Sequence, residues 1–348
     1  MPAKLPTVSI LIPCHNESLG IRACLRSCIQ QSVPFNRIIV VDDASTDNTV
    51  EIIEKSFDLK KNHIQLIKLT KNKGNKSYVQ EHGLQFIDTE IFVATDGDTV
   101  LSPNFVEKLL PHFQNPQVHA AAGRVKSLRD NWLTACREID YNIAQLIHKR
   151  AQSEINAVVV IPGCAGAFRT QTFKQHITFD HDTLTEDLDF TYKLHLQNYK
   201  IVFEPEAIVY TQDPADLKSY IKQMTRWYTG NFQNMRKHSQ TLLKKPALAV
   251  EITLAYTEGI LFSIIIFLLP ILNPNLVMLL IAPFLLTSII VASWVAFKDR
   301  RLDLIIYSPM MLLVIYINSA IFIRELYKVM VLNKKDLIWH KAARKQIQ

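Results

Sequence analysis

The chain has 348 residues, which suggests one large domain with an appendage. Hydrophobic residues make up 48% of it and charged residues 20%, which excludes a disordered or low-complexity protein, and nine glycines exclude a collagen-like architecture. Of the net charge of +7, +5 lies in residues 324–348, where seven Lys and Arg accompany two acids. The rest of the chain is close to neutral, so we expect no nucleic acid among its partners.

The cysteines indicate a reducing compartment. Their number is odd, and none of their spacings resembles a zinc site, so we expect buried thiols. Residues 1–6 are short and polar and a strand-like run begins at Thr7, so we expect no signal peptide and a cytosolic N-terminal part. The cysteines are Cys14, Cys24, Cys28, Cys136 and Cys164.

Short apolar runs alternate with helical patterns in the first hundred residues. This alternation predicts βαβ units and an α/β fold with a mainly parallel sheet, in which ligands bind at the carboxyl ends of strands. No G-x-G-x-x-G or G-x-x-x-x-G-K-[ST] pattern is present, so nothing supports a dinucleotide dehydrogenase or a P-loop NTPase. The predicted strands are Val8–Pro13, Arg37–Val41, Ile64–Leu69 and Ile91–Ala94, and the predicted helices are Glu17–Gln31, Asp47–Phe57 and a segment ending at Phe86.

The second half of the chain is strongly apolar. Gly259–Phe297, 39 residues in succession, carries no charge. A bilayer core needs about 20 helical residues, so this stretch predicts two spans with a turn at Asn273-Pro274-Asn275. A third apolar stretch, Leu304–Ile323, is interrupted by Pro309. A soluble core does not need three such runs, so we expect membrane insertion, with spans at about 249–272, 276–297 and 304–323.

The charges beside the spans bear on orientation. With a cytosolic N-terminal part, two crossings return the basic segment 298–301 to the inner side, as the positive-inside rule predicts. A third full crossing would place the basic tail outside, so either residues 304–323 re-enter without crossing or the tail is an exception. In the tail, residues 324–348, apolar residues 337–339 lie among basic ones, which suits an amphipathic helix on an anionic inner leaflet.

Two acidic pairs follow predicted strands. Asp96-Gly97-Asp98 comes directly after the fourth strand, and both carboxylates can face one pocket if the chain turns at Gly97. Such hard ligands suit Mg²⁺ or Mn²⁺ bridging to a diphosphate, while the plain alternative is a solvated turn. Asp42 and Asp43 end the second strand, where they either bind the base and ribose of a nucleoside or make an ordinary Asx turn and helix cap.

Thr185-Glu186-Asp187 precedes an amphipathic stretch, Leu188–Gln197. Either it places a general base at a helix N-terminus, or it is a common helix start with acids in its first turn. Pro162–Arg169 holds two of the nine glycines, which either a close approach to a ligand or a buried turn would require.

Residues 214–236 predict an amphipathic helix at the membrane surface, ahead of the spans. Gln223, Arg226 and Trp227 share one face of this helix. An Arg can grip a diphosphate through two hydrogen bonds and a Trp can stack on a sugar ring. The alternative is that Arg226 and Trp227 only anchor the helix at the interface.

The order of these motifs resembles that of processive-type membrane glycosyltransferases of family 2, such as cellulose, chitin-oligosaccharide, hyaluronan and poly-N-acetylglucosamine synthases. The resemblance covers roughly residues 6–330. One departure is that the Lys expected directly after Gly74 is replaced by Asn75, with Lys76 one place later. The motifs are Pro13 with Asn16-Glu17, Asp42-Asp43, Asp96-Gly97-Asp98, Thr185-Glu186-Asp187 and Gln223-x-x-Arg226-Trp227, followed by membrane spans.

The resemblance implies a GT-A fold that uses a UDP-sugar with Mg²⁺ or Mn²⁺. It implies that Asp187 is the catalytic base and that Asp98, with Asp96, holds the metal. The implied donor nucleotide-binding residues are Pro13, Asn16, Glu17, Asp42, Asp43, Asp96 and Arg226. The implied acceptor-binding residues are Gly163, Cys164, Glu186, Gln223 and Trp227.

We therefore expect an inverting transfer of a sugar, with N-acetylglucosamine as the first candidate and glucose next, to a growing β-linked glycan. The alternatives are single-sugar transfer to a lipid-linked acceptor and, in a different class, a non-catalytic membrane subunit; a partner subunit stays open. We expect a multi-pass protein of the inner cell membrane with a cytosolic catalytic domain. The expected parts are a catalytic domain at 1–213, an interface helix region at 214–245, a transmembrane region at 246–323 and a basic tail at 324–348.

Overall fold

The computed structural model describes residues 5–334 and 346–347, and these form two compact units. The first unit contains residues 5–126, 150–212 and 346–347, and the second contains residues 127–149 and 213–334. The sequence-based boundaries kept all of 1–213 together, whereas the contacts group residues 127–149 with the helical second unit. Of the predicted tail, residues 324–334 are described and begin as helix, whereas residues 335–345 and 348, with Trp339, lie outside the described residues.

The first unit contains a mixed sheet whose described strands follow the order β3-β2-β1-β4-β7-β6-β8-β5. The first strands in sequence pair in parallel, β1 with β2 and β4, and β2 with β3, as the βαβ pattern predicts. The later strands add antiparallel pairs, β4 with β7, β6 with β7, and β5 with β8. The strands are β1 Val8–Cys14, β2 Ile38–Asp42, β3 Ile64–Lys68, β4 Ile91–Ala94, β5 Thr99–Leu101, β6 Val118–Ser127, β7 Gly166–Arg169 and β8 Lys200–Thr211.

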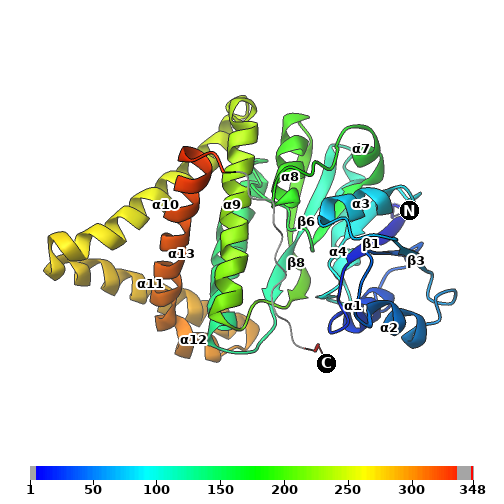
Figure 1. The fold of residues 1–348 in the computed structure, drawn as a ribbon, viewed down its shortest axis with the longest axis horizontal. Coiled ribbons are helices and arrows are strands. Elements are labelled where there is room, and N and C mark those ends of the chain that lie inside the picture. The colour runs from blue at the N-terminus through cyan, green and yellow to red at the C-terminus, as the bar shows by residue number, and fades with distance from the viewer. Residues whose placement is uncertain (1–4, 335–345, 348) are drawn as a thin grey trace. The chain divides into compact units, whose positions relative to one another are not determined.

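Helices cover both faces of this sheet. Side chains alternate between the faces of a strand, and β1 is buried along its whole length, so neither of its faces is left to solvent. Helix α3 packs on β1 and β2, and α4 packs on β8 (Figure 1). The helices of this unit are α1 Ile21–Ile29, α2 Thr49–Ser56, α3 Lys76–Leu84, α4 Phe105–Leu109, α6 Arg150–Glu154, α7 Thr170–Gln175 and α8 Glu186–Leu196.

An aromatic cluster joins the sheet to helices α7 and α8. The Phe168 ring on β7 lies 5.1 Å from Phe92 on β4, 4.9 Å from Phe173 and 5.3 Å from Phe190, measured between ring centroids. All four side chains are buried. Offset and edge-on ring pairs of this kind add to the stabilisation from the buried apolar area, so this cluster holds α8 against the sheet.

The second unit is helical. Helix α9 runs beside α13, and α10 and α11 form a hairpin (Figure 1). Three polar pairs join α9 to α13: Tyr220 Oη donates to Asn318 at 2.8 Å, Arg324 to Thr225 at 2.7 Å, and Thr229 to Glu325 at 3.0 Å. The helices are α5 Trp132–Asn142, a π-helical turn Ile143–Lys149, α9 Leu217–Leu242, α10 Pro246–Leu272, α11 Val277–Asp299, α12 Asp303–Tyr307, α13 Met311–Leu326 and a π-helical turn Tyr327–Val331.

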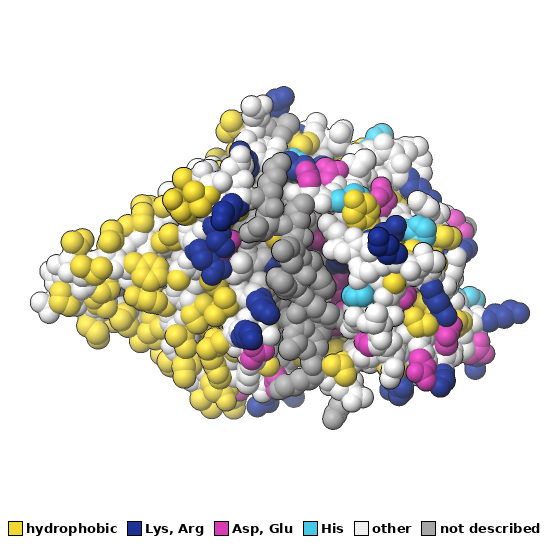
Figure 2. Space-filling model, viewed as in Figure 1, with side chains coloured by type: hydrophobic (Ala, Val, Ile, Leu, Met, Phe, Trp, Pro, Cys, Tyr) yellow, Lys and Arg dark blue, Asp and Glu magenta, His cyan; other side chains and the backbone are white. Residues whose placement is uncertain are grey.

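Three helical stretches of this unit are long and apolar enough to cross a membrane: Pro246–Leu272, Pro274–Asp299 and Asp303–Val331. Figure 2 shows hydrophobic side chains gathered over the hairpin of α10 and α11, with few charges among them. Exposing an apolar surface of this kind to water costs free energy, whereas a bilayer core accommodates it. These candidate spans follow the α/β unit in sequence, which fits a membrane protein.

We expect Phe168→Ala to lower the free energy of unfolding by about 3–5 kcal/mol, because it removes a buried ring that contacts three others. Phe297→Ala is the control, since that side chain is 78% exposed. Chemical denaturation of the full chain in detergent measures both. Equal stability of the two variants would contradict the assigned core.

Candidate active site

The pairing of three parallel strands brings the predicted donor-site residues to one edge of the sheet. In β1 and β2, Cys14 pairs with Asp42, and in β1 and β4, Leu11 pairs with Ala94. The segments after β1, β2 and β4 therefore leave the sheet side by side. These segments carry Asn16-Glu17, Asp43 and Asp96-Gly97-Asp98.

Asp42 and Asp43 are both buried and both accept backbone hydrogen bonds. Asp42 Oδ2 accepts from the Ser45 N–H, three residues on, at 3.1 Å, which is a local contact within the turn after β2. Asp43 Oδ1 accepts from the Lys73 N–H at 2.8 Å, so it ties the loop after β3 to the end of β2. Burial raises the pKa of Asp43, while the hydrogen bond from Lys73 opposes that rise.

The segment after β1 holds the loop after β2. Asn16 has a positive φ of 54°, and its Oδ1 accepts from the Thr46 N–H at 2.7 Å. The Glu17 N–H donates to Thr49 Oγ1 at 2.7 Å, at the first turn of α2. Pro13 pairs with Val41 inside the sheet. These three residues were predicted to bind the donor. Their observed contacts fix the backbone conformation at this edge of the sheet.

The Asp96-Gly97-Asp98 turn packs closely against its neighbours. A Cβ on Gly97 would lie 2.9 Å from Glu17 Cγ, and a Cβ on Gly20 would lie 2.8 Å from the Asp98 Cα. Only glycine allows both approaches. Asp98 is buried. The two glycines thus let the turn and the start of α1 meet without displacing either carboxylate.

Lys76 joins two of the acidic residues that the sequence placed in the site, Asp96 and Glu186. Its Nζ lies 2.5 Å from Asp96 Oδ1, 3.4 Å from Glu186 Oε1 and 3.4 Å from the carbonyl oxygen of Gly163. Burial alone would lower the pKa of Lys76, but the carboxylates of Asp96 and Glu186 outweigh it and raise that pKa above its ordinary value. Lys76 therefore stays charged at neutral pH.

Sequence reasoning gave Lys76 no role, because the lysine stands one place later than the motif predicts. In the structure Asn75 is the N-cap of α3, and its side chain accepts from the Ser77 N–H at 3.0 Å. Lys76 is then the first residue of the helix. A cap residue followed by a lysine was the signal that could have identified it.

Asp187 lies in the first turn of α8. Its Oδ2 accepts from the Gly163 N–H at 3.4 Å and its Oδ1 from the Leu188 N–H at 2.9 Å. Gly163 also adjoins Glu186, since a Cβ placed there would lie 3.5 Å from Glu186 Oε1. Asp96, Lys76, Gly163, Glu186 and Asp187 thus form one cluster, although they come from four separate segments of the chain.

Cys164 lies in this cluster and is the one partly exposed cysteine; the others are buried, and all five are free. Burial raises the pKa of its thiol to about 12, and the negative charge of Asp96 adds to the effect. The thiol is therefore neutral at physiological pH. A neutral thiol is a poor nucleophile, so this residue suits a lining role.

The site fits a divalent cation held jointly with a ligand. Asp96 and Asp98 offer hard oxygen donors, and the ammonium group already seated on Asp96 marks a place that favours positive charge. Within residues 5–334 and 346–347, no group of three or more His, Cys, Asp or Glu is arranged to hold a metal. Mg²⁺ is commonly held by one or two carboxylates together with substrate phosphates, which matches this pair.

Gln223, Arg226 and Trp227 lie on α9 in the second unit. Trp227 is partly buried, and its ring centroid lies 5.0 Å from the guanidinium carbon of Arg137 on α5. Gln223 Oε1 is buried without a hydrogen-bond partner among the described residues. Sequence reasoning did not single out Arg137. A joint site of these residues with Asp187 stays a prediction.

The sequence model of the family described as "Glycosyltransferase like family 2" matches residues 6–230, more than half of the chain. The chain therefore belongs to glycosyltransferase family 2 and is a glycosyltransferase, as the order of motifs predicted. The poly-beta-1,6-N-acetyl-D-glucosamine synthase of Staphylococcus epidermidis is 30% identical over 249 residues, 70% of this chain and 59% of that protein. The enzyme of the same name from Staphylococcus aureus is 28% identical over 66% of this chain and 56% of its own. The chain thus spans less than two thirds of the curated relatives it matches.

Solved structures confirm the fold. A mannosyltransferase from Pyrobaculum calidifontis, in complex with GDP-Man and Mn²⁺, matches with a TM-score of 0.65 at 19% identity, covering 96% of this chain and 89% of its own. Residues 1–349 of Staphylococcus aureus TarS match with a TM-score of 0.54 at 18% identity, covering 92% and 91%. At these identities the likeness concerns the fold alone, which is the predicted α/β GT-A fold followed by apolar helices.

We expect alkylation of Cys164 by iodoacetamide to accelerate about tenfold per pH unit from pH 7 to pH 10, because only the thiolate reacts and its pKa lies above that range. Mass spectrometry of the labelled peptide gives the rate, and Cys164→Ser is the control for labelling elsewhere. A plateau below pH 9 would contradict the raised pKa.

Proposed function

We propose that this family 2 glycosyltransferase transfers a sugar, with N-acetylglucosamine as the best candidate, from a UDP-sugar to a growing β-linked glycan at the membrane. The observation that carries the proposal is the cluster of Asp96, Lys76, Glu186 and Asp187 at one edge of the sheet. The printed names of the staphylococcal relatives support the choice of sugar.

Asp187 is the proposed general base of an inverting single displacement. Its carboxylate takes the proton of the acceptor hydroxyl, whose oxygen then attacks the anomeric carbon from the face opposite the leaving UDP. The two backbone hydrogen bonds from Gly163 and Leu188 fix the orientation of the carboxylate. A base held in this way loses less entropy when the acceptor arrives.

The donor diphosphate is proposed to lie against Asp96 and Asp98, which would hold Mg²⁺ or Mn²⁺. Such an ion, when bound, neutralises charge on the diphosphate leaving group. Carboxylates alone would repel a diphosphate, and the Lys76 ammonium lowers this repulsion because it offsets part of the negative charge of Asp96 and Glu186. For Arg226 we retain the diphosphate-binding role that the Q-x-x-R-W motif implies, and for Gln223 and Trp227 the acceptor role.

The proposed location is the inner membrane of the cell, with the α/β unit in the cytosol, where UDP-sugars are available. The three candidate spans support membrane attachment. Residues 298–301, between the second and third of them, carry three basic residues against one acid, which favours the cytosolic side for this loop.

The main test incubates membranes containing the full chain with a panel of UDP-sugars and Mn²⁺, followed by sizing of the product. We expect a polymer from UDP-N-acetylglucosamine and loss of product on addition of EDTA. A single addition to a lipid would instead support the lipid-linked alternative. No metal-dependent UDP release from any donor would refute the proposal and favour a non-catalytic subunit.

We expect Asp187→Asn to lower turnover by about 10²–10⁴-fold, because the amide cannot accept the acceptor proton. The dissociation constant for the UDP-sugar should stay within about twofold, since Asp187 acts on the acceptor. Asp182→Asn, an exposed position five residues earlier, is the matched control. Near-normal turnover of Asp187→Asn would show that the base is assigned wrongly.

We expect Lys76→Met to weaken donor use, with kcat/KM for the UDP-sugar about 10- to 100-fold lower, because a charged hydrogen bond is lost and two carboxylates lose their counter-ion. Lys73→Met is the control: Lys73 is exposed and contacts Asp43 through its backbone N–H. If both variants behaved alike, the charge-balancing role of Lys76 would be excluded.

A further inference from the structure

A buried arginine lies beneath the tryptophan of the Q-x-x-R-W motif. Arg137, on α5, is 2% exposed. Its guanidinium carbon lies 4.5 Å from the ring centroid of Tyr141, 5.0 Å from that of Trp227 and 5.8 Å from that of Tyr220. All of these residues belong to the second unit. Three aromatic rings from α5 and α9 thus surround one cation.

Two carboxylates keep this cation in place. Arg137 Nη1 donates to Asp140 Oδ2 at 2.8 Å, and Nε lies 3.7 Å from Asp213 Oδ1, which also accepts from the Tyr141 hydroxyl at 2.9 Å. Nε and Nη2 of Arg137 have no hydrogen-bond partner within the part of the chain that the structure describes. A buried guanidinium with N–H groups left over is stabilised chiefly by charge and by the faces of its aromatic neighbours.

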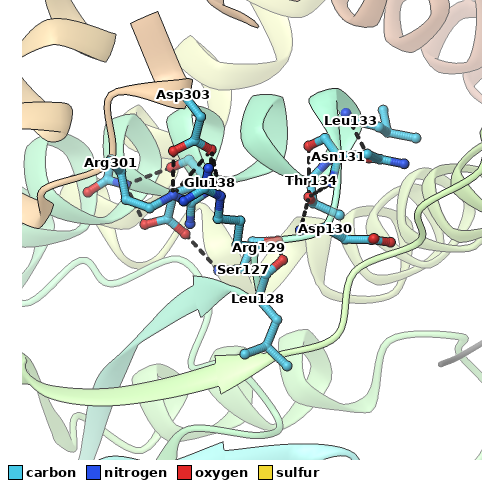
Figure 3. Close-up of polar contacts among 11 residues, drawn as sticks. Ser127, Leu128, Arg129, Asp130, Asn131, Leu133, Thr134, Glu138, Arg301 and Asp303 are labelled. Atoms are coloured by element: carbon cyan, nitrogen blue, oxygen red, sulfur yellow. Dashed lines mark hydrogen bonds and ion pairs between the residues drawn. The ribbon is translucent and has the colours of Figure 1, made fainter. Parts of the chain in front are cut away.

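Helix α5 is held firmly enough to position this arginine. Its N-cap, Asn131, accepts from the Thr134 N–H at 3.3 Å while Thr134 Oγ1 accepts from the Asn131 N–H at 3.0 Å, a complete capping box (Figure 3). The Asn131 side chain also donates to the Ala215 carbonyl at 2.6 Å, just before α9. One turn further on, Glu138 accepts from the Ser127 N–H at 2.6 Å (Figure 3).

We propose that Arg137 is a positioning residue for the acceptor: its guanidinium holds the indole of Trp227 in the orientation that stacks on the acceptor sugar. The inference rests on the proposed function, in which Trp227 contacts the acceptor. Trp227 is only partly buried, so it keeps surface for a sugar while Arg137 lies against it. Arg137 itself is too buried to touch the acceptor, so it acts through Trp227.

A lysine cannot replace this arginine in the proposed role. It would keep the positive charge beside Asp213, but its compact ammonium lacks the planar group that stacks on aromatic rings. Arg137→Lys therefore separates orientation of Trp227 from simple charge balance. Arg129→Lys is the matched control: Arg129 precedes the same helix, its side chain is 69% exposed, and it lies 3.8 Å from Asp303 (Figure 3).

The first measurement compares transfer with hydrolysis in the full-length membrane protein. With UDP-N-acetylglucosamine as donor and an N-acetylglucosamine pentasaccharide as acceptor, we expect Arg137→Lys to raise the acceptor KM on the order of 10-fold. UDP release to water, without acceptor, should stay unchanged, as should both quantities in Arg129→Lys. An equal loss of transfer and hydrolysis would indicate a general structural role and overturn the inference.

The second measurement follows the fluorescence of Trp227 and does not depend on enzyme activity. In a chain whose other tryptophans are replaced by phenylalanine, Trp132, Trp294 and Trp339, we expect Arg137→Lys to shift the emission of Trp227 and to increase its quenching by acrylamide. An unchanged emission would overturn the inference. So would a shifted emission with an unchanged acceptor KM. If the parent protein used no donor at all, the proposed function would fail. The emission of Trp227 would still show whether Arg137 contacts its indole.

If Arg137→Lys does not fold, Asp213→Asn serves in its place. It removes the charge that anchors the guanidinium while leaving an oxygen for the Tyr141 hydroxyl. The same pattern of a raised acceptor KM, unchanged hydrolysis and shifted emission is expected, and its absence would count against the role of Arg137.

Discussion

The parallel pairing of β1 with β2 and with β4 is the constraint on which the site in the first unit depends. Parallel strands that pair in register end at the same edge of a sheet, so segments distant in sequence leave the sheet as neighbours. Both faces of these strands are buried, so close packing of their side chains holds the register, which a slip by one residue would disrupt. Asp43 and the Asp96-Gly97-Asp98 turn therefore lie on either side of the end of β1 and the segment that follows it.

Close packing at that edge creates an electrostatic problem, which one lysine solves. Asp96 and Glu186, both only partly buried, are brought to the same place, and two carboxylates there would repel each other. Lys76 lies against both, and their charges hold its pKa above the ordinary value in spite of burial. The same lysine offsets part of the negative charge that a diphosphate would otherwise meet, so the arrangement that stabilises the fold is compatible with the proposed donor site.

The second unit solves a related problem by different means. Arg137 is buried beside Asp213, and neither carboxylates nor carbonyl oxygens satisfy all of its N–H groups. Aromatic rings from α5 and α9 lie against the guanidinium instead. Polar pairs such as Tyr220–Asn318 then fasten α9 to α13. The motif helix is thus held both by a buried cation and by the third apolar stretch.

The sequence by itself determined the α/β class, the first four strands, the apolar helices and the motifs that mark the family. Those features depend on local periodicity and on the order of residues along the chain, which a sequence contains in full. It left the choice between a turn and a ligand site open at Asp42, and this stays a prediction, because the hydrogen bond from the Ser45 N–H is compatible with both. Lys76 and Arg137 gained their roles only from the tertiary structure. A lysine displaced by a helix cap and an arginine inside a helix have no distinctive local pattern, because their partners, Glu186 and Trp227, lie about a hundred residues away.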